Sequence, residues 1–116
     1  MSIEIPDINT ETGLSLYDDD VELYKSVLDS FISSTPVVLD KLRDVSSETL
    51  QEYKIQIHAL KSICESIGAE EITTTARKLE AMAKKGDLDG LLAGNGDFLE
   101  KTDILVDNIR NWLGKN

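Results

Sequence analysis

The chain has one cysteine and one histidine among its 116 residues, and these shortages exclude several kinds of site. A single cysteine, Cys64, rules out an internal disulfide and a C-x-x-C metal or redox motif. A single histidine, His58, rules out the di-iron site of helical bundles, which needs Glu-x-x-His pairs on two helices; the residue three before His58 is also Ile55. We therefore expect no metal and no cofactor, and we expect Cys64 to be a buried, unreactive thiol.

The sequence motifs of nucleotide-binding and hydrolytic enzymes are also missing. No Walker-type or G-x-G-x-x-G pattern occurs, and the GNG of residues 94–96 lacks the lysine and the preceding strand that such a pattern needs. No G-x-S-x-G elbow presents a serine nucleophile, and a nucleophile of either kind would depend on His58 as its base. We expect no autonomous kinase or hydrolase activity.

Positive charge is scarce as well. Lys and Arg number 12 against 22 Asp and Glu, for a formal net charge of -10. Nucleic acid and anionic lipid attract clustered Lys and Arg because their phosphates dominate the affinity, so neither is an expected partner. The sequence has no apolar run of membrane-spanning length, and its N-terminus lacks the charged-then-apolar order of a signal peptide. We expect a cytoplasmic protein.

The apolar residues that are present recur at helical spacing. The clearest series covers residues 50–67 with intervals of three and four, and further series cover 21–45, 72–83 and 98–113. The clearest series consists of Leu50, Tyr53, Ile57, Leu60, Cys64 and Ile67. No stretch alternates with the period of two that is typical of a half-buried strand. The pattern predicts a single all-α domain, residues 1–116, folded as an antiparallel four-helix bundle.

The boundaries of the predicted helices are less clear in the first 45 residues of the chain. Residues 1–12 are polar and include Pro6, so they are expected to form a short N-terminal arm or helix. The aspartates at 18–20 are suited to cap the first long helix. Pro36 interrupts the pattern of that helix and is expected either to start a new helix or to introduce a kink.

Boundary signals are clearer in the second half of the chain. Thr49 and Glu52 have the spacing of a capping box, and Gly68 is placed to end the helix that they begin. Three glycines and an asparagine within residues 87–96 predict a flexible loop, so that the last helix is expected to start near Asp97.

The one histidine lies on the flank of the clearest helix. At 100° per residue, His58 is turned about 120° from the centre of the apolar stripe, so its ring is expected beside the core and partly open to solvent. Lys54, Lys61 and Ser62 lie one turn away, and Glu65 lies two turns away. Position alone favours a solvated histidine without a role. A neutral imidazole is nevertheless a good nucleophile, and a nearby lysine would neutralise incoming phosphoryl oxygens.

The stretch HALKSICESIGAEEITTTARKLEAMAKKGD, which begins at His58, resembles the core of a histidine-containing phosphotransfer (HPt) domain. The typical run of that family is His-x-Leu-Lys-Gly-Ser-Ser-x-x-Ile-Gly-Ala. The upstream stretch GLSLYDDDVELYKSVLDSFISSTPVVLDKL is similar to the segment that leads into this core, so the resemblance spans nearly the whole chain. The matching positions are His58, Leu60, Lys61, Ile67, Gly68 and Ala69. Two positions differ, since Ser62 replaces a glycine and Ile63 replaces a small residue.

The resemblance implies a phosphorelay intermediate of a two-component system. His58 would be the phosphoacceptor, taking a phosphoryl group from a receiver domain or a sensor histidine kinase and passing it to another receiver. Lys61 would stabilise the phosphoryl group, and Lys54, Ser62 and Glu65 would contribute to partner docking on the same helix face. The resemblance and a closed bundle favour a monomer.

Glu80 is predicted to orient the histidine. The helix that follows Gly68 is expected to run back antiparallel, so a residue ten before the turn should lie level with one about ten to twelve after it. Glu80 flanks the core position Leu79, and similar domains carry Glu or Gln at this place. Its carboxylate is expected to accept the Nδ1 proton of His58 and to leave Nε2 free to attack.

A non-catalytic helical adaptor is the alternative function. Such a protein would keep the HPt fold and the docking face without using the histidine. The departures at Ser62 and Ile63 favour this alternative, as does Glu65, which places a carboxylate where the family usually has a small residue.

Overall fold

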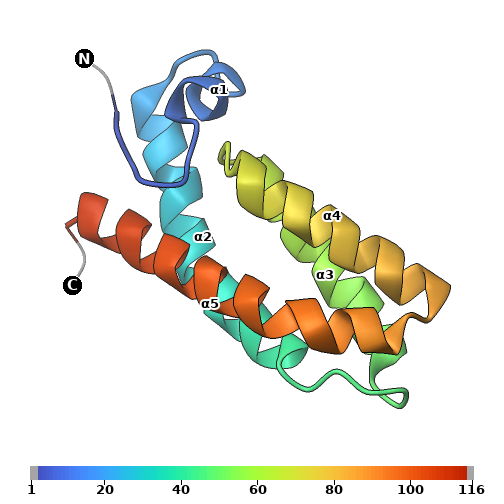
Figure 1. Ribbon diagram of the computed structural model, residues 1–116. Coiled ribbons are helices and arrows are strands. Elements are labelled where there is room, and N and C mark those ends of the chain that lie inside the picture. The colour runs from blue at the N-terminus through green and yellow to red at the C-terminus, as the bar shows by residue number, and fades with distance from the viewer. Residues whose placement is uncertain (1–2, 115–116) are drawn as a thin grey trace.

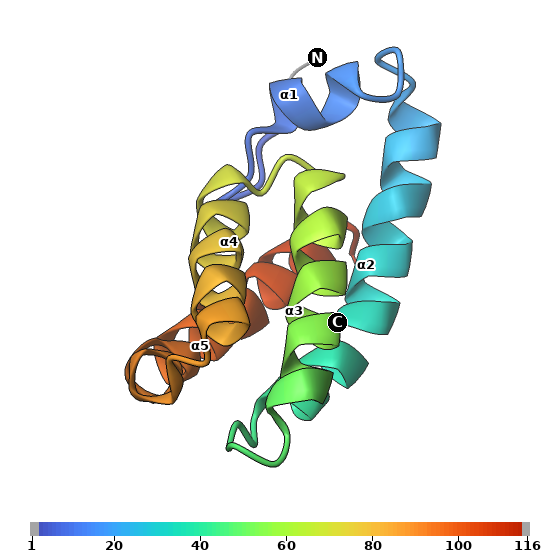
Figure 2. The same cartoon turned by 90° about the vertical axis from the view of Figure 1, so that its right-hand side faces the viewer.

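The computed structural model describes residues 3–114, which form five α-helices and no strand (Figure 1). The helices are α1 (Thr10–Ser15), α2 (Val21–Leu42), α3 (Leu50–Glu65), α4 (Glu70–Lys85) and α5 (Leu88–Trp112). Contacts join α2 to α3, α3 to α4, α4 to α5 and α5 back to α2, so the four long helices close around one core. Figure 2 shows α2, α3 and α4 side by side with α5 behind them. The predicted all-α bundle is confirmed.

Each long helix buries one apolar stripe in this core. Side chains of about the size of leucine contribute roughly 1.5–3 kcal/mol each when they are fully buried. Those that are fully enclosed include Leu28, Leu39, Ile57, Leu60, Leu91 and Leu105. Cys64 lies among them, and burial raises the pKa of its thiol to about 12. The expected burial of Cys64 is therefore confirmed.

The ends of α2 and α3 follow the sequence signals only in part. Asp20 caps α2, because its side chain accepts a hydrogen bond from the backbone N–H of Leu23. Pro36 lies inside α2, so the first of the two alternatives predicted there, a new helix start, is wrong. The predicted capping box at Thr49 is also wrong. Its hydroxyl donates instead to the carbonyl oxygen of Asp44 at 2.8 Å, within the turn between α2 and α3.

The flexible loop predicted at residues 87–96 is wrong, because α5 begins at Leu88 and continues through the whole stretch. Asp87 caps this helix by accepting a hydrogen bond from the backbone N–H of Gly90 at 3.0 Å. The glycines cost about 1 kcal/mol each relative to alanine in a helix interior. Tertiary contacts of the neighbouring side chains offset that cost.

One set of these contacts is made by Asn95, which is buried between three helices. Its amide donates to the backbone carbonyl oxygen of Leu42 at 2.8 Å, and its side-chain oxygen accepts from the hydroxyl of Tyr53 at 2.8 Å. Leu91, one turn earlier, is fully buried. The start of α5 is therefore held helical by α2 and α3.

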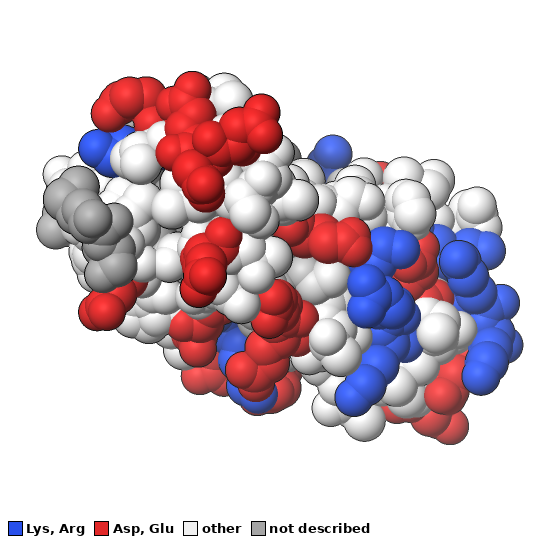
Figure 3. Space-filling view, turned by 90° about the horizontal axis from the view of Figure 1, so that it is seen from above, with Lys and Arg blue, Asp and Glu red and all other residues white. Residues whose placement is uncertain are grey.

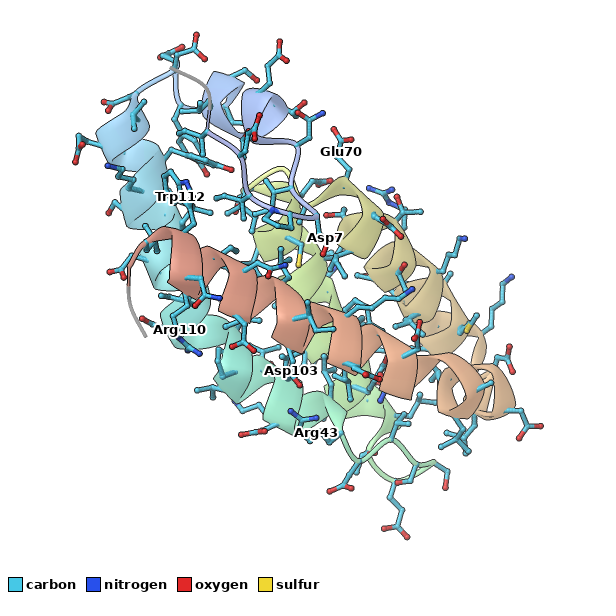
Figure 4. All side chains as sticks on the ribbon, turned by 60° about the vertical axis from the view of Figure 1, so that its left-hand side comes forward. Asp7, Arg43, Glu70, Asp103, Arg110 and Trp112 are labelled. Atoms are coloured by element: carbon cyan, nitrogen blue, oxygen red, sulfur yellow. The ribbon has the colours of Figure 1, made fainter. Side chains whose placement is uncertain are left out.

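A second link between α2 and α5 lies at the surface. Figure 4 shows the Arg43 side chain, just after α2, pointing toward Asp103 of α5, and the closest nitrogen–oxygen distance is 3.4 Å. Both side chains are about half exposed, so this pair contributes no more than about 1 kcal/mol.

The N-terminal arm packs against the bundle at the end where α3 turns into α4. Ile3 and Ile5 are buried in the common core, and α1 begins at Thr10, within the stretch predicted as an arm. The turn itself contains Gly68, whose φ of 83° is in the left-handed region. A Cβ at Gly68 would lie 2.4 Å from the carbonyl oxygen of Asn9, so the arm requires glycine there.

Two tyrosines hold the same turn from the other side. The hydroxyls of Tyr17 and Tyr24 donate to the carbonyl oxygens of Ser66 and Ile67, at 2.8 and 2.7 Å. These hydrogen bonds fix how α4 leaves α3, and hence which residues of the two helices face each other.

Candidate functional site

The histidine lies on the outer flank of α3, where the sequence places it. Its neighbours Ile57 and Leu60 are fully buried, whereas the side chain of His58 is 62% exposed. Each residue of a helix is rotated 100° from the last, so the residue after an inward-facing one emerges at the edge of the core. The expectation of a ring beside the core and partly open to solvent is confirmed.

The carboxylate of Glu80 on α4 lies against this ring. Its Oε2 atom is 2.5 Å from Nδ1 of His58, and its Oε1 atom accepts a hydrogen bond from Nζ of Lys61 at 2.8 Å. Nζ of Lys84, one turn further along α4, lies 3.7 Å from Oε2. Three side chains therefore surround one carboxylate, and two of them come from α3.

The carboxylate is buried because Glu80 adjoins the core position Leu79 on α4. Burial alone would raise the pKa of Glu80, but hydrogen bonds from Lys61 and His58, together with the charges of Lys61 and Lys84, lower it below its ordinary value. The carboxylate is therefore ionised near neutral pH. A buried charge without partners would cost several kcal/mol, so the three partners are also what makes this burial tolerable.

The ionised carboxylate determines where the proton of the imidazole lies. An ionised carboxylate can only accept hydrogen bonds, so Nδ1 of His58 must be the donor in the contact with Glu80. In a neutral ring, the other nitrogen, Nε2, then carries the free electron pair. The arrangement prepares Nε2 to act as a nucleophile.

His58 lies in a shallow, open depression between α3 and α4. Its lining residues are Lys54, Ile55, His58, Glu80 and Lys84. In the top view of Figure 3, Lys and Arg gather toward the end of the molecule where α4 meets α5, while Asp and Glu gather toward the end that carries α1. Two of the residues that share the depression with His58, Lys54 and Lys84, are lysines, in a chain whose net charge is -10.

The three residues predicted to dock a partner lie in different surroundings. Lys54 shares the depression with His58. The exposed Ser62 turns its hydroxyl back to the carbonyl oxygen of His58, at 3.3 Å. Glu65 lies outside the depression and pairs with Arg77 of α4 at 3.4 Å. The structure thus brings Lys54 into the histidine site and leaves Glu65 near the turn between the two helices.

Two residues of the depression were not predicted from the sequence as part of the site. Lys84 lies four residues after Glu80, so helical spacing alone would have placed both on one face of α4. Ile55 precedes His58 by three residues on α3, and its side chain is 54% exposed within the depression. The apolar residue outside the regular stripe was the available signal for it.

Searches for two other kinds of site give negative findings for residues 3–114. No group of three or more His, Cys, Asp or Glu side chains in this range is arranged to hold a metal ion. In the same part of the chain, no helix combines the length and the apolar character needed to cross a membrane.

Comparison with known protein families finds one match that covers most of the chain. A family model described as Hpt domain matches residues 26–112. This range contains His58, Lys61, Glu80 and Lys84, and it leaves out the arm, α1 and the first turn of α2. Comparisons with curated proteins and with solved structures find no match.

Proposed function

The chain belongs to the Hpt domain family, whose members carry phosphoryl groups in phosphorelay signalling, and we propose that His58 is the residue that is phosphorylated. In this proposal the phosphoryl group comes from the aspartyl phosphate of a receiver domain or from a sensor histidine kinase. His58 then passes it to the aspartate of another receiver domain. The chain acts as a carrier, in the cytoplasm and as a monomer, and it has no kinase or hydrolase activity of its own.

The observation that carries the proposal is the contact between Nδ1 of His58 and the ionised Glu80. In the transfer step, the free electron pair of Nε2 attacks the phosphorus of the aspartyl phosphate. A P–N bond forms, the P–O bond to the aspartate breaks, and the aspartate leaves as a carboxylate. No proton has to move, because Nδ1 keeps its hydrogen throughout and the ring becomes cationic.

Glu80 has a clear part in this scheme. Its negative charge, 2.5 Å from Nδ1, favours the cationic phosphorylated ring over the neutral one. Lys61 and Lys84 hold Glu80 ionised, and their positive charges also favour the approach of a phosphoryl group to the neighbouring ring. The side chain of Lys84 is 66% exposed, so it is the freer of the two to follow phosphoryl oxygens.

The alternative of a non-catalytic adaptor loses part of its support. Glu65 pairs with Arg77 outside the depression, so its carboxylate does not face the imidazole. Ser62 lies one turn from His58, with its hydroxyl bonded to the backbone carbonyl oxygen of that residue, so this departure from the family pattern stays relevant to the phosphoryl transfer.

The test is phosphorylation of the purified chain by phosphorylated receiver domains and, separately, by the small phosphodonor phosphoramidate. The expected product is a single phosphoryl group that is lost in acid and is stable in alkali, as a phosphohistidine is. His58→Gln should abolish it and leave helicity unchanged, because the His58 side chain is 62% exposed and the glutamine amide can still donate a hydrogen bond to Glu80. A phosphorylated His58→Gln protein would contradict the proposal.

A further inference from the structure

The surface around His58 differs on its two sides along α3. Toward the N-terminus of α3, the depression contains the exposed Ile55 together with Lys54 and Lys84. Toward the C-terminus, Glu65 is neutralised by Arg77, and no exposed large apolar side chain is present among the described residues of that part of α3. The apolar contact and the available charge therefore lie on one side of the histidine.

The two lysines on that side are available to a partner. Lys54 makes no ion pair or hydrogen bond with any residue of the described range, 3–114. Lys84 is 66% exposed, and its distance of 3.7 Å from the Glu80 carboxylate is long for a hydrogen bond. Lys54 is half-buried and Lys84 is mostly exposed, so a partner carboxylate can reach Lys84 while His58 and Lys61 keep their hydrogen bonds to Glu80.

The negative net charge of the chain favours a partner that is acidic where it meets the depression. The net charge of -10 repels an acidic partner from the chain as a whole, whereas Lys54 and Lys84 of the depression attract one. Such a contrast orients two proteins before they touch and raises the rate of productive encounters. An apolar side chain such as Ile55 together with charged neighbours is the usual composition of a protein interface, in which apolar contacts form the centre and polar groups the rim.

We propose that the receiver domain docks on the N-terminal side of His58, with an apolar side chain packed on Ile55 and with acidic groups facing Lys54 and Lys84. This inference rests on the proposed function, since it identifies the surface and the partner chemistry of the same site. It places Ser62 at the rim of the interface and Glu65 outside it.

A second depression, between α4 and α5, provides matched control positions. Ile104 and Lys101 are among its lining residues, and Ile104 is 48% exposed against 54% for Ile55. Asp7, which also lines this second depression, is labelled in Figure 4. Substitutions there leave α3 untouched, and Lys101 differs from Lys54 in that it pairs with Asp97 of α5 at 3.2 Å.

The experiment uses a receiver domain that, when phosphorylated, transfers its phosphoryl group to the unmodified chain. The second-order rate constant of this transfer is then measured for each variant. Each rate is divided by the rate at which the same variant reacts with phosphoramidate, which needs no docking surface. Ile55→Glu is expected to lower this ratio about tenfold or more, and Ile55→Ser by less, as at a central interface residue. Ile104→Glu should leave the ratio within twofold.

The charge part of the proposal has its own readout. Lys54→Glu is expected to lower the transfer rate about three- to tenfold at low ionic strength and by less at high ionic strength, because salt screens exposed charges. Lys101→Glu is the control and should show little change in either condition.

The outcomes separate this inference from the proposed function. Equal effects of Ile55→Glu and Ile104→Glu, in proteins with unchanged helicity, would overturn the docking surface while the phosphorylation of His58 stands. A chain that reacts with phosphoramidate and with no receiver domain would overturn the receiver as partner, and the docking surface with it. A chain that reacts with neither would contradict the proposed function itself.

Discussion

Glu80 and Asn95 are two polar side chains that the bundle buries to the same extent, each 4% exposed, yet they link the helices in opposite ways. Asn95 is neutral, and its hydrogen bonds to Tyr53 and Leu42 close a contact between three helices inside the core. Glu80 is charged, and its partners include the mostly exposed ring of His58. The closed network stabilises the fold, whereas the open one brings a buried charge to a reactive surface.

The largest effect is expected from removing the closed network. Asn95→Ala leaves the carbonyl oxygen of Leu42 and the hydroxyl of Tyr53 without partners in the core, which should lower the free energy of unfolding by about 2–4 kcal/mol. Urea denaturation measures this loss. Asn111→Ala, at an exposed position of the same helix, is the control and should cost less than about 0.5 kcal/mol. An equal decrease in the free energy of unfolding for both variants would show that the Asn95 network does not stabilise the fold.

The next effect concerns the open network and should appear in the transfer rate. Glu80→Ala removes the acceptor for Nδ1 of His58, and phosphorylation by phosphoramidate should slow about 10- to 100-fold. Glu80→Gln keeps an oxygen that can accept the Nδ1 hydrogen and should recover part of the rate, while the exposed Glu71→Ala should have no effect.

Nitrogen-15 NMR of the imidazole provides a readout that a purely structural role of Glu80 would not change. The free protein should show the hydrogen on Nδ1 of His58, and Glu80→Ala should shift the population toward the form with the hydrogen on Nε2. An unchanged ratio of the two forms would show that the contact does not set the position of the proton.

A smaller effect, the pH dependence of the free energy of unfolding, also distinguishes the two networks. The pKa of Glu80 is lowered in the folded protein, so its contribution to stability is fully present above the ordinary value of 4.5 and is lost as the pH falls through the lowered folded value. The free energy of unfolding of the unmodified chain should therefore fall more steeply below pH 4.5 than that of Glu80→Gln. Asn95→Ala should keep the steep slope, because its network carries no charge. Parallel curves for all three proteins would contradict the ionised state of Glu80.

The smallest effect is expected at the exposed surface, outside both networks. Ser62 lies one turn from His58, where the resembling family has glycine, so its side chain narrows the approach of a receiver domain. Ser62→Gly should raise the transfer rate from a phosphorylated receiver a few-fold and lower the free energy of unfolding by up to about 1 kcal/mol. A lower transfer rate in an intact bundle would make Ser62 a ligand of the phosphoryl group instead.

Most of the histidine site was predictable because its geometry depends on one helix and one turn. The spacing within α3 determines that His58 follows an inward-facing residue, and that Lys61 lies one turn away. The glycine in the following turn implies that α4 runs back along α3, which is enough to bring Glu80 level with the ring. The roles of these residues in transfer remain predictions.

The errors occur where contacts from other helices outweigh local preference. Residues 87–96 contain three glycines, and no local signal reveals that Asn95 finds hydrogen-bond partners on α2 and α3 that hold the stretch helical. The hydroxyl of Thr49 was expected to cap its own helix and instead bonds to the preceding turn. Glu65 was expected to face the histidine and is drawn to Arg77 on the neighbouring helix.

The sequence by itself determined the helices, their inward faces and the exposure of His58, because helical periodicity converts spacing along the chain directly into direction around an axis. Only the tertiary structure decided that the Glu80 carboxylate, which was predicted to face His58, would be buried and would also pair with Lys61 and Lys84, and that the surface beside the ring would be apolar and basic on one side alone. Those features depend on how closely α4 packs on α3 and on which side chains of the two helices then meet, and periodicity within one helix contains no information on that packing.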